Sequence, residues 1–434
     1  MASIDSRSRA WVEVDLGAIR SNVAAIAAFF GRGASVMAVV KADAYGHGLL
    51  PVARDAIAAG AGWLGIATIG EGDLLREAKI TTPIALLSAP AVADAAEIVR
   101  YGLTAMVGDA AILDALHAHA SLCNSELTVH LDIDTGIGRS GVLPKDAVAL
   151  WRHACSLGIR VEGISTHFAN AGGVDDGHTR SQMLEFDQTL AALHASGACF
   201  EWTHIDNSAS ITACASEPKS LPGILSAGLP RVAQQLRRGI TDQECSAQGR
   251  SRSLSEPKSL LDRSRFPAPS ATCNLVRPGL LIYGIAPRSA VEAVIEVRPA
   301  LALNARIATI RDLPINHAIS YGVTHRLLRN SRVATVSIGY GDGYPRALSN
   351  RGYMLVRGRR APILGTVCMD QTIVDVTEIA DASPGDEVVC IGKQSGESIT
   401  VEQIAASTGV TLHEITTGLT ARLPRVYTGS VSWS

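Results

Sequence analysis

Short apolar runs recur through the first two-thirds of the chain, and alanine-rich stretches of helical character separate them. Strands that alternate with helices predict a parallel sheet, because each parallel pair needs a long crossover connection. Eight such units favour a (β/α)8 barrel of the TIM type, with its active site at the carboxyl ends of the strands. An open doubly wound sheet is the alternative, but no G-x-G-x-x-G follows the first of these runs. We expect the eight strands at residues 35–40, 63–68, 83–88, 103–107, 127–133, 161–167, 199–205 and 275–282.

The last third of the chain has a different pattern, in which short strand-like segments follow one another with turns between them. One turn signal is Pro384-Gly385-Asp386. We therefore predict two domains, an α/β barrel over residues 1–294 and a C-terminal mainly-β domain over residues 295–434. The strands expected in the second domain are at residues 301–310, 332–340, 353–356, 363–369, 372–376 and 387–391.

The composition excludes several classes of protein. A chain of 434 residues with 47% hydrophobic and 18% charged residues can bury a large core. The formal net charge of −2 provides no general attraction to nucleic acid or to an anionic membrane. No apolar run approaches the roughly 20 residues needed to span a bilayer. The polar start predicts no secretory signal, and eight cysteines without a C-x-x-C pair predict neither a zinc site nor disulfides, so we expect a cytoplasmic protein without a bound metal.

The first expected strand of the barrel ends in a lysine, Lys41, and Gly46 and Gly48 follow it closely. Burial disfavours the charged form of a lysine, and a neutral amine can attack a carbonyl group. The ordinary alternative is a strand that ends where its lysine reaches water, and Lys41 alone favours that alternative.

Other polar residues follow the later strands. Each has an ordinary explanation: His167 as a core histidine, Arg139 in a surface ion pair, and Asn207-Ser208 as a helix N-cap. Because all strand ends of a barrel meet at one rim, their occurrence together with a lysine favours a site. The residues in question are Asp132, Arg139, His167, Asn207, Ser208 and Arg277.

The segment Val39-Val40-Lys41-Ala42-Asp43-Ala44-Tyr45-Gly46-His47-Gly48 closely resembles the pyridoxal-phosphate (PLP) lysine segment of alanine racemases, which have fold type III. The resemblance implies that Lys41 holds the cofactor and that Tyr45 binds its phosphate. Phosphate contacts are also implied for Ser208 and for the backbone of Gly279-Leu280, and a cofactor contact for Asn207.

The same resemblance assigns the residues around the cofactor ring. Arg139 matches the arginine at the phenolic oxygen, and Arg277 matches the arginine at the pyridine nitrogen. An arginine is always protonated, so it cannot give the ring nitrogen a full positive charge, and the ring is a weaker electron sink. His167 matches the histidine between Arg277 and a catalytic tyrosine.

Two features depart from the family pattern. Many members have a carbamylated lysine where this chain has Asp132, so Asp132 either orients Arg139 in its place or only packs at the strand end. In addition, 68 residues separate Ser208 from Arg277, and Ser-Glu-Pro-Lys-Ser-Leu occurs twice, at residues 216–221 and 255–260. We predict a poorly ordered surface insertion at about residues 214–265, with a short helix near 232–238.

The second domain carries further motif matches. Ile319-Ser320-Tyr321-Gly322 resembles the segment with the second catalytic base, which Arg346 would support. Tyr340 and Met369, in the segments 338–343 and 367–371, would shape the substrate entrance, and Tyr427 would reach the phosphate. In the family, the β domain of one subunit caps the barrel of the other, which implies a homodimer with shared active sites. The resemblance covers residues 11–427 without the insertion.

The implied function is the interconversion of L-alanine and D-alanine, supplying D-alanine for peptidoglycan. Lys41 and Tyr321 would act as bases on opposite faces of the substrate, with Arg139, Tyr321, Tyr340 and Met369 contacting it. An ordinary phenol has a pKa near 10, so positive groups must activate the tyrosine. Two alternatives are a decarboxylase of the same fold, which would need a glutamate where Arg277 stands, and a non-catalytic PLP-binding single barrel, which would lack the β domain.

Overall fold

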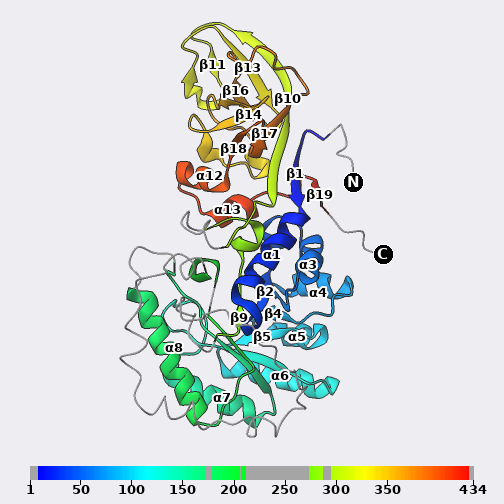
Figure 1. The fold of residues 1–434 in the computed structure, drawn as a ribbon, viewed down its shortest axis with the longest axis vertical. Helices are drawn as coiled ribbons and strands as arrows, with labels where there is room; N and C mark the ends of the chain where they lie inside the picture. The colour runs from blue at the N-terminus through cyan, green and yellow to red at the C-terminus, as the bar shows by residue number, and fades with distance from the viewer. Residues whose placement is uncertain (1–7, 172–176, 206, 212–272, 287–294, 430–434) are drawn as a thin grey trace.

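A computed structural model describes residues 8–171, 177–205, 207–211, 273–286 and 295–429. The predicted insertion at 214–265, with its expected helix, lies outside these residues. Within them, Figure 1 shows an α/β part below and a β-rich part above, joined along the long axis of the molecule. None of the described helices is long and apolar enough to cross a bilayer.

The α/β part is a nearly closed parallel barrel, as predicted. Its strands follow the order β8-β7-β6-β5-β4-β3-β2-β9 in the described residues. The N–H of Asn274 donates to the carbonyl of Thr203 (3.0 Å), and a parallel bridge joins Asn207 to Arg277, which brings the two edges together. The strands are β2 (Ser35–Val39), β3 (Trp63–Ile66), β4 (Ile84–Leu86), β5 (Thr104–Val107), β6 (Thr128–Asp132), β7 (Arg160–Ser165), β8 (Trp202–His204) and β9 (Leu275–Val276).

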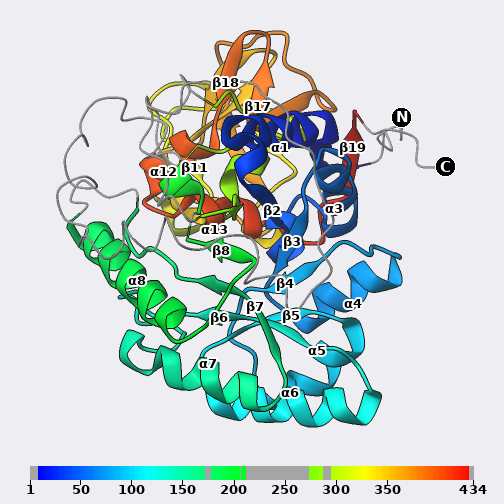
Figure 2. The ribbon, with the colours of Figure 1, turned by 60° about the horizontal axis from the view of Figure 1, so that its bottom comes forward.

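Helices cover the outside of these strands, as Figure 2 shows for α4 to α8. They bury apolar faces against the barrel, because each crossover must cover one side of a sheet that is apolar on both faces. The helices are α1 (Leu16–Phe30), α3 (Leu49–Ala58), α4 (Ile69–Glu77), α5 (Ala95–Tyr101), α6 (Ala110–Cys123), α7 (Ala147–Ser156) and α8 (Gly177–Ala195).

The β-rich part is built on a nine-stranded sheet of the described residues. The strand β1 (Ala10–Asp15), at the start of the chain, lies in this sheet, antiparallel to β10 and parallel to β19. This placement was not expected from the sequence. The other strands of the part are β10 (Leu301–Leu313), β11 (Ala318–Ile319), β12 (His325–Arg326), β13 (Ser331–Val336), β14 (Tyr353–Val356), β15 (Arg359–Pro362), β16 (Thr372–Asp375), β17 (Glu387–Gln394), β18 (Glu397–Ile399) and β19 (Arg425–Thr428).

Two expected strands of this part were placed inaccurately. Residues 363–369 form no strand and contribute only a single bridge between Ile363 and Val374. The reason is Gly365, whose φ of +74° interrupts an extended chain. The strand expected at 332–340 ends at Val336, because the N–H of Ile338 donates back to the carbonyl of Val336 (2.9 Å), and a 3-10 turn follows at Tyr340.

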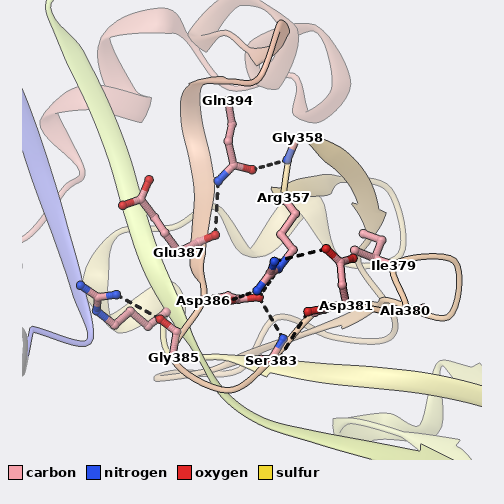
Figure 3. A network of polar contacts seen from close by, with 12 residues as sticks. Arg357, Gly358, Ile379, Ala380, Asp381, Ser383, Gly385, Asp386, Glu387 and Gln394 are labelled. Atoms are coloured by element: carbon pink, nitrogen blue, oxygen red, sulfur yellow. Dashed lines mark hydrogen bonds and ion pairs between the residues drawn. The ribbon is translucent and has the colours of Figure 1, made fainter.

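The turn between β14 and β15 is tied to the start of β17, as Figure 3 shows. Arg357 and Gly358 have φ values of +50° and +75°, as in the tight turn of a two-residue hairpin. The Arg357 guanidinium donates to both carboxylate oxygens of Asp386 (2.7 and 2.9 Å) and to Asp381 (3.2 Å), and it lowers the pKa of Asp386. The network orients the hairpin, although exposed ion pairs stabilise little.

The end of the chain returns to the barrel. Helices α12 (Val401–Thr408) and α13 (Leu412–Thr417) lie beside the junction of the two parts, and α13 contacts the short helix α2 (Lys41–Tyr45). Arg425 donates to the carbonyls of Gly46 (3.2 Å) and Leu419 (2.8 Å). The segment after Lys41 is therefore held by residues almost 400 positions away.

Candidate active site

The segment that carries Lys41 has an unusual backbone. Residues Ala42–Tyr45 have φ values of +52° to +53°, so α2 is a left-handed turn rather than the plain loop expected from the glycines. Each left-handed non-glycine residue costs about 1–2 kcal/mol. Hydrogen bonds hold the turn: Glu71 Oε1 accepts from the N–H of Ala42 (2.6 Å), and Asp43 Oδ1 accepts from the N–H of Leu49 (2.8 Å). Such retained strain is typical of a functional segment.

Lys41 opens onto a cavity of about 880 Å³ at the carboxyl ends of the barrel strands. The structure places all ten barrel residues that the sequence singled out around this cavity. They are Lys41, Tyr45, Asp132, Arg139, His167, Asn207, Ser208, Arg277, Gly279 and Leu280. Burial, assisted by the charge of Arg139, lowers the pKa of Lys41 below its usual value, which favours the nucleophilic amine.

One end of the cavity is suited to a phosphate. Ser208 Oγ accepts from the backbone N–H of Gly279 (2.8 Å) and of Leu281 (3.4 Å). A Cβ on Gly279 would lie 2.7 Å from the hydroxyl of Tyr45, so only glycine fits there. Burial raises the pKa of Tyr45 to about 12, so its hydroxyl stays protonated and can donate to an anion. Because the Ser208 oxygen accepts two hydrogen bonds, its own O–H is left to donate, and it joins the Tyr45 hydroxyl as a neutral donor for phosphate.

The side chain of Asn207 has a local role. Its Oδ1 accepts from the N–H groups of Ala209 and Ser210, both at 3.0 Å, as an N-cap residue does. The ordinary explanation of this residue is therefore correct for its carbonyl oxygen, and a cofactor contact stays a prediction.

Arg277 is buried and lies among acceptors. Its guanidinium donates to Nδ1 of His204 (2.5 Å), to the carbonyl of Thr166 (2.7 Å) and to Nδ1 of His167 (3.3 Å). Burial, followed by the charge of Arg277, lowers the pKa of His167 to about 3. His167 is therefore neutral, and because Nδ1 accepts, its proton is on Nε2.

Asp132 and Arg139 both line the cavity but form no ion pair in the described structure. The carboxylate of Asp132 accepts from the hydroxyls of Ser140 (3.0 Å) and Ser165 (3.1 Å). This arrangement favours the second of the two expectations for Asp132, a residue that packs at its strand end. The orientation of Arg139 then has to come from another group.

The sequence did not identify one group of cavity residues, which comes from α13 and the residue before it. Thr411, Leu412, His413 and Thr417 line the cavity, and the ring centroid of His413 lies 5.5 Å from that of Tyr45. Burial, followed by the charge of Lys41, lowers the pKa of His413. Nothing in the local pattern around His413 indicates a position beside Tyr45, so only the tertiary fold could reveal it.

Tyr427 does not line the cavity. Its hydroxyl lies against Gly48, where any Cβ would overlap it. The expected contact between Tyr427 and the phosphate stays a prediction.

The predicted residues of the β-rich part do not line the cavity of their own chain. Tyr321, Tyr340 and Met369 are 76%, 42% and 52% exposed. The N–H of Tyr340 donates to the carbonyl of Cys368 (3.0 Å), beside Met369, so these segments lie side by side. Arg346 is exposed and also lies apart from the cavity.

Comparison with known proteins decides the family. The family described as "Alanine racemase, N-terminal domain" matches residues 14–229, and "Alanine racemase, C-terminal domain" matches residues 300–427. An alanine racemase from Halothermothrix orenii is 35% identical over 422 residues, which are 97% of each chain. This chain belongs to the alanine racemase family. Another alanine racemase, from Symbiobacterium thermophilum, is 34% identical over 99% of this chain and 100% of its own.

Solved structures of alanine racemases share the whole fold. The enzyme from the D-cycloserine producer Streptomyces lavendulae superimposes with a TM-score of 0.81 and 30% identity, covering 98% of this chain and 99% of its own. The enzyme from Bacillus anthracis, solved with bound L-Ala-P, has a TM-score of 0.78 and 29% identity, with coverages of 98% and 96%. Alanine racemases are PLP-dependent isomerases, and the donors of this cavity fit that cofactor: a partly buried amine, a phosphate cradle that a Cβ would fill, and a buried arginine.

Proposed function

We propose that this protein is an alanine racemase that interconverts L-alanine and D-alanine with PLP, as a homodimer. The observation that carries the proposal is the convergence of Lys41, Arg277 and the Ser208–Gly279 cradle on one cavity. PLP would be held by the Lys41 amine, by the Tyr45 hydroxyl and the cradle at its phosphate, and by Arg277 at its ring. When bound, PLP withdraws electrons from the substrate carbon and so makes its hydrogen acidic.

Lys41 and Tyr321 are the proposed bases. Lys41 takes or returns the proton on one face of the substrate carbon as a neutral amine, which its lowered pKa favours. Tyr321 of a second subunit does the same on the opposite face. His167 supports the tyrosine, because its Nε2–H is left to donate to a phenolate oxygen once Nδ1 has accepted from Arg277. Arg139 would bind the substrate carboxylate.

The position of Tyr321, which does not line the cavity of its own chain, supports the proposed dimer. The described β-rich part exposes several large apolar side chains, and exposed apolar side chains favour association. They are Ile315, Tyr321, Val323, Leu328, Tyr340 and Met369. We propose that this surface caps the barrel of a second copy, with Tyr340, Met369 and Arg346 near its entrance. The reaction would supply D-alanine for peptidoglycan in the cytoplasm.

The test is to follow L-alanine in heavy water with the purified protein and added PLP. Optical rotation and deuterium at the Cα are measured together. The proposal predicts that rotation decays to zero while deuterium enters at a comparable rate, because each base exchanges protons with solvent. Deuterium incorporation without loss of rotation would mean that only the Lys41 side works. No change in either quantity would refute the proposed activity.

A further inference from the structure

A row of side chains runs from Arg277 into the interior of the barrel. Arg277 Nη1 lies 2.5 Å from Nδ1 of His204, whose Nε2 lies 2.8 Å from Nδ1 of His130. Nε2 of His130 has no hydrogen-bond partner among the described residues, and it faces Oε1 of Glu162 at 3.5 Å. The two histidines are fully buried, and the Glu162 side chain is 11% exposed. The row draws its members from β8, β6, β7 and the end of β9, so it exists only because the barrel closes.

The hydrogen bonds of this row have one direction. A guanidinium can only donate, so Nδ1 of His204 must accept, and the proton of this neutral imidazole is on Nε2. That N–H points at Nδ1 of His130, which must also accept. The proton of His130 is therefore on Nε2, the atom nearest the carboxylate of Glu162. Burial lowers the pKa of both histidines, which is consistent with neutral rings throughout.

The side chain of His130 packs directly against Gly163, which has no Cβ. A Cβ on Gly163 would lie 2.6 Å from both Cγ and Cδ2 of His130. The φ of Gly163 is not positive, so the backbone itself does not require glycine there. The ring of Trp63 lies against His130 with the centroids 5.3 Å apart. The position of the imidazole is thus fixed on two sides by packing.

We propose that His130 and Glu162 are positioning residues for Arg277. Arg277 and the negative charge of Glu162, at opposite ends of the row, favour the same tautomers of His204 and His130. With these tautomers His204 accepts the hydrogen bond that orients the guanidinium. If His130 carried its proton on Nδ1, two N–H groups would face each other, that of His130 Nδ1 and that of His204 Nε2. His204 could avoid this repulsion only by moving its proton from Nε2 to Nδ1. Arg277 would then lose an acceptor and turn, changing what it presents to the ring of PLP. The effect on PLP rests on the proposed function, whereas the tautomer assignment rests only on the hydrogen bonds of the row.

The test compares three substitutions in the full-length protein. Glu162→Leu removes the carboxylate that faces Nε2 of His130, and Glu162→Gln keeps an oxygen at that place. The matched control is Glu201→Leu, because Glu201 also pairs with Arg160 (2.8 Å) but is 54% exposed, and its charge acts on His130 less than those of Glu162 and Arg277. Each protein is labelled with ¹⁵N-histidine, and the ring nitrogens are observed by NMR without and with PLP.

We expect His130 and His204 to carry their protons on Nε2 in the wild type, in Glu162→Gln and in Glu201→Leu. In Glu162→Leu at least one of them should show a protonated or exchanging Nδ1. With PLP, Glu162→Leu should shift the absorption band of the cofactor and reduce kcat about tenfold with KM unchanged, whereas the other two should match the wild type. Gly163→Ala, which displaces His130 without removing a charge, should reproduce the effects of Glu162→Leu.

Unchanged tautomers in Glu162→Leu would overturn the proposal, as would equal effects of Glu162→Leu and Glu201→Leu. A wild-type protein without racemase activity would refute the proposed function but would leave the tautomer measurement as a valid test of the row.

Discussion

Acidification should destabilise the folded protein through His47, in the segment that follows Lys41. The His47 side chain is fully buried, its Nδ1 lies 3.0 Å from the carbonyl oxygen of Tyr45, and its ring centroid lies 4.4 Å from that of Tyr283. Its Nε2 has no hydrogen-bond partner among the described residues. Burial therefore lowers the pKa of His47 from 6.5 to about 4.

The sign and size of the effect follow from proton linkage. Between pH 6.5 and about 4 the unfolded chain binds a proton at His47 and the folded chain does not, so the free energy of unfolding falls as the pH falls. With these two pKa values, the titration of His47 leaves the free energy of unfolding almost unchanged at pH 7.5 and lowers it by about 2 kcal/mol at pH 5.0. His47→Asn removes the titration, while its amide N–H can still donate to the carbonyl of Tyr45.

The assay is urea unfolding of both proteins at pH 7.5 and pH 5.0, at one protein concentration and with saturating PLP. Between pH 7.5 and pH 5.0, the free energy of unfolding of the wild type should fall by about 2 kcal/mol more than that of His47→Asn. His317→Asn, at an exposed position, is the control and should follow the wild type. The reasoning is refuted if the wild type and His47→Asn lose the same free energy of unfolding on acidification.

Three further predictions concern the active site. Tyr321→Phe should reduce L-to-D turnover by about 10²- to 10⁴-fold while the absorption of bound PLP is retained, and loss of the cofactor would count against its role as a base. His413→Phe keeps the ring contact with Tyr45 but removes a hydrogen-bond donor from the cavity wall, so the Kd for PLP, measured by fluorescence titration, should rise about tenfold or more. An unchanged Kd would exclude a contact between His413 and the cofactor. In Gly46→Ala the new Cβ would overlap the carbonyl oxygen of Thr416. The control is Gly409→Ala, because Gly409 has nearly the same backbone conformation (φ +77°, ψ 3° against φ +81°, ψ 4°) but open space around it. In thermal or urea unfolding, Gly409→Ala should lower the free energy of unfolding by about 1 kcal/mol and Gly46→Ala by at least about 3 kcal/mol. Equal losses for these two glycine variants would contradict the close packing of α13 on the Lys41 segment.

Much of the barrel could be predicted because its signals are local. Each strand is a short apolar run, and each helix is an adjacent amphipathic stretch, so the alternation is visible without any knowledge of contacts. Parallel strands place their carboxyl ends at one rim, which is why Arg139, His167 and Arg277 could be expected near Lys41. Sequence patterns only a few residues long are therefore enough to predict the fold class and the barrel residues of the site.

Contacts between distant segments could not be predicted in this way. The left-handed turn at Ala42–Tyr45 opposes local preference and is held by Glu71 from another helix and by Arg425 near the end of the chain. Strand β1 has no local feature that distinguishes a barrel strand from a strand of the C-terminal sheet. The surroundings of His413 and His130 likewise come from residues far away in sequence, Tyr45 and His204. Such contacts form only when the whole domain folds, so they produce no hydrophobic period in either segment that a sequence could reveal.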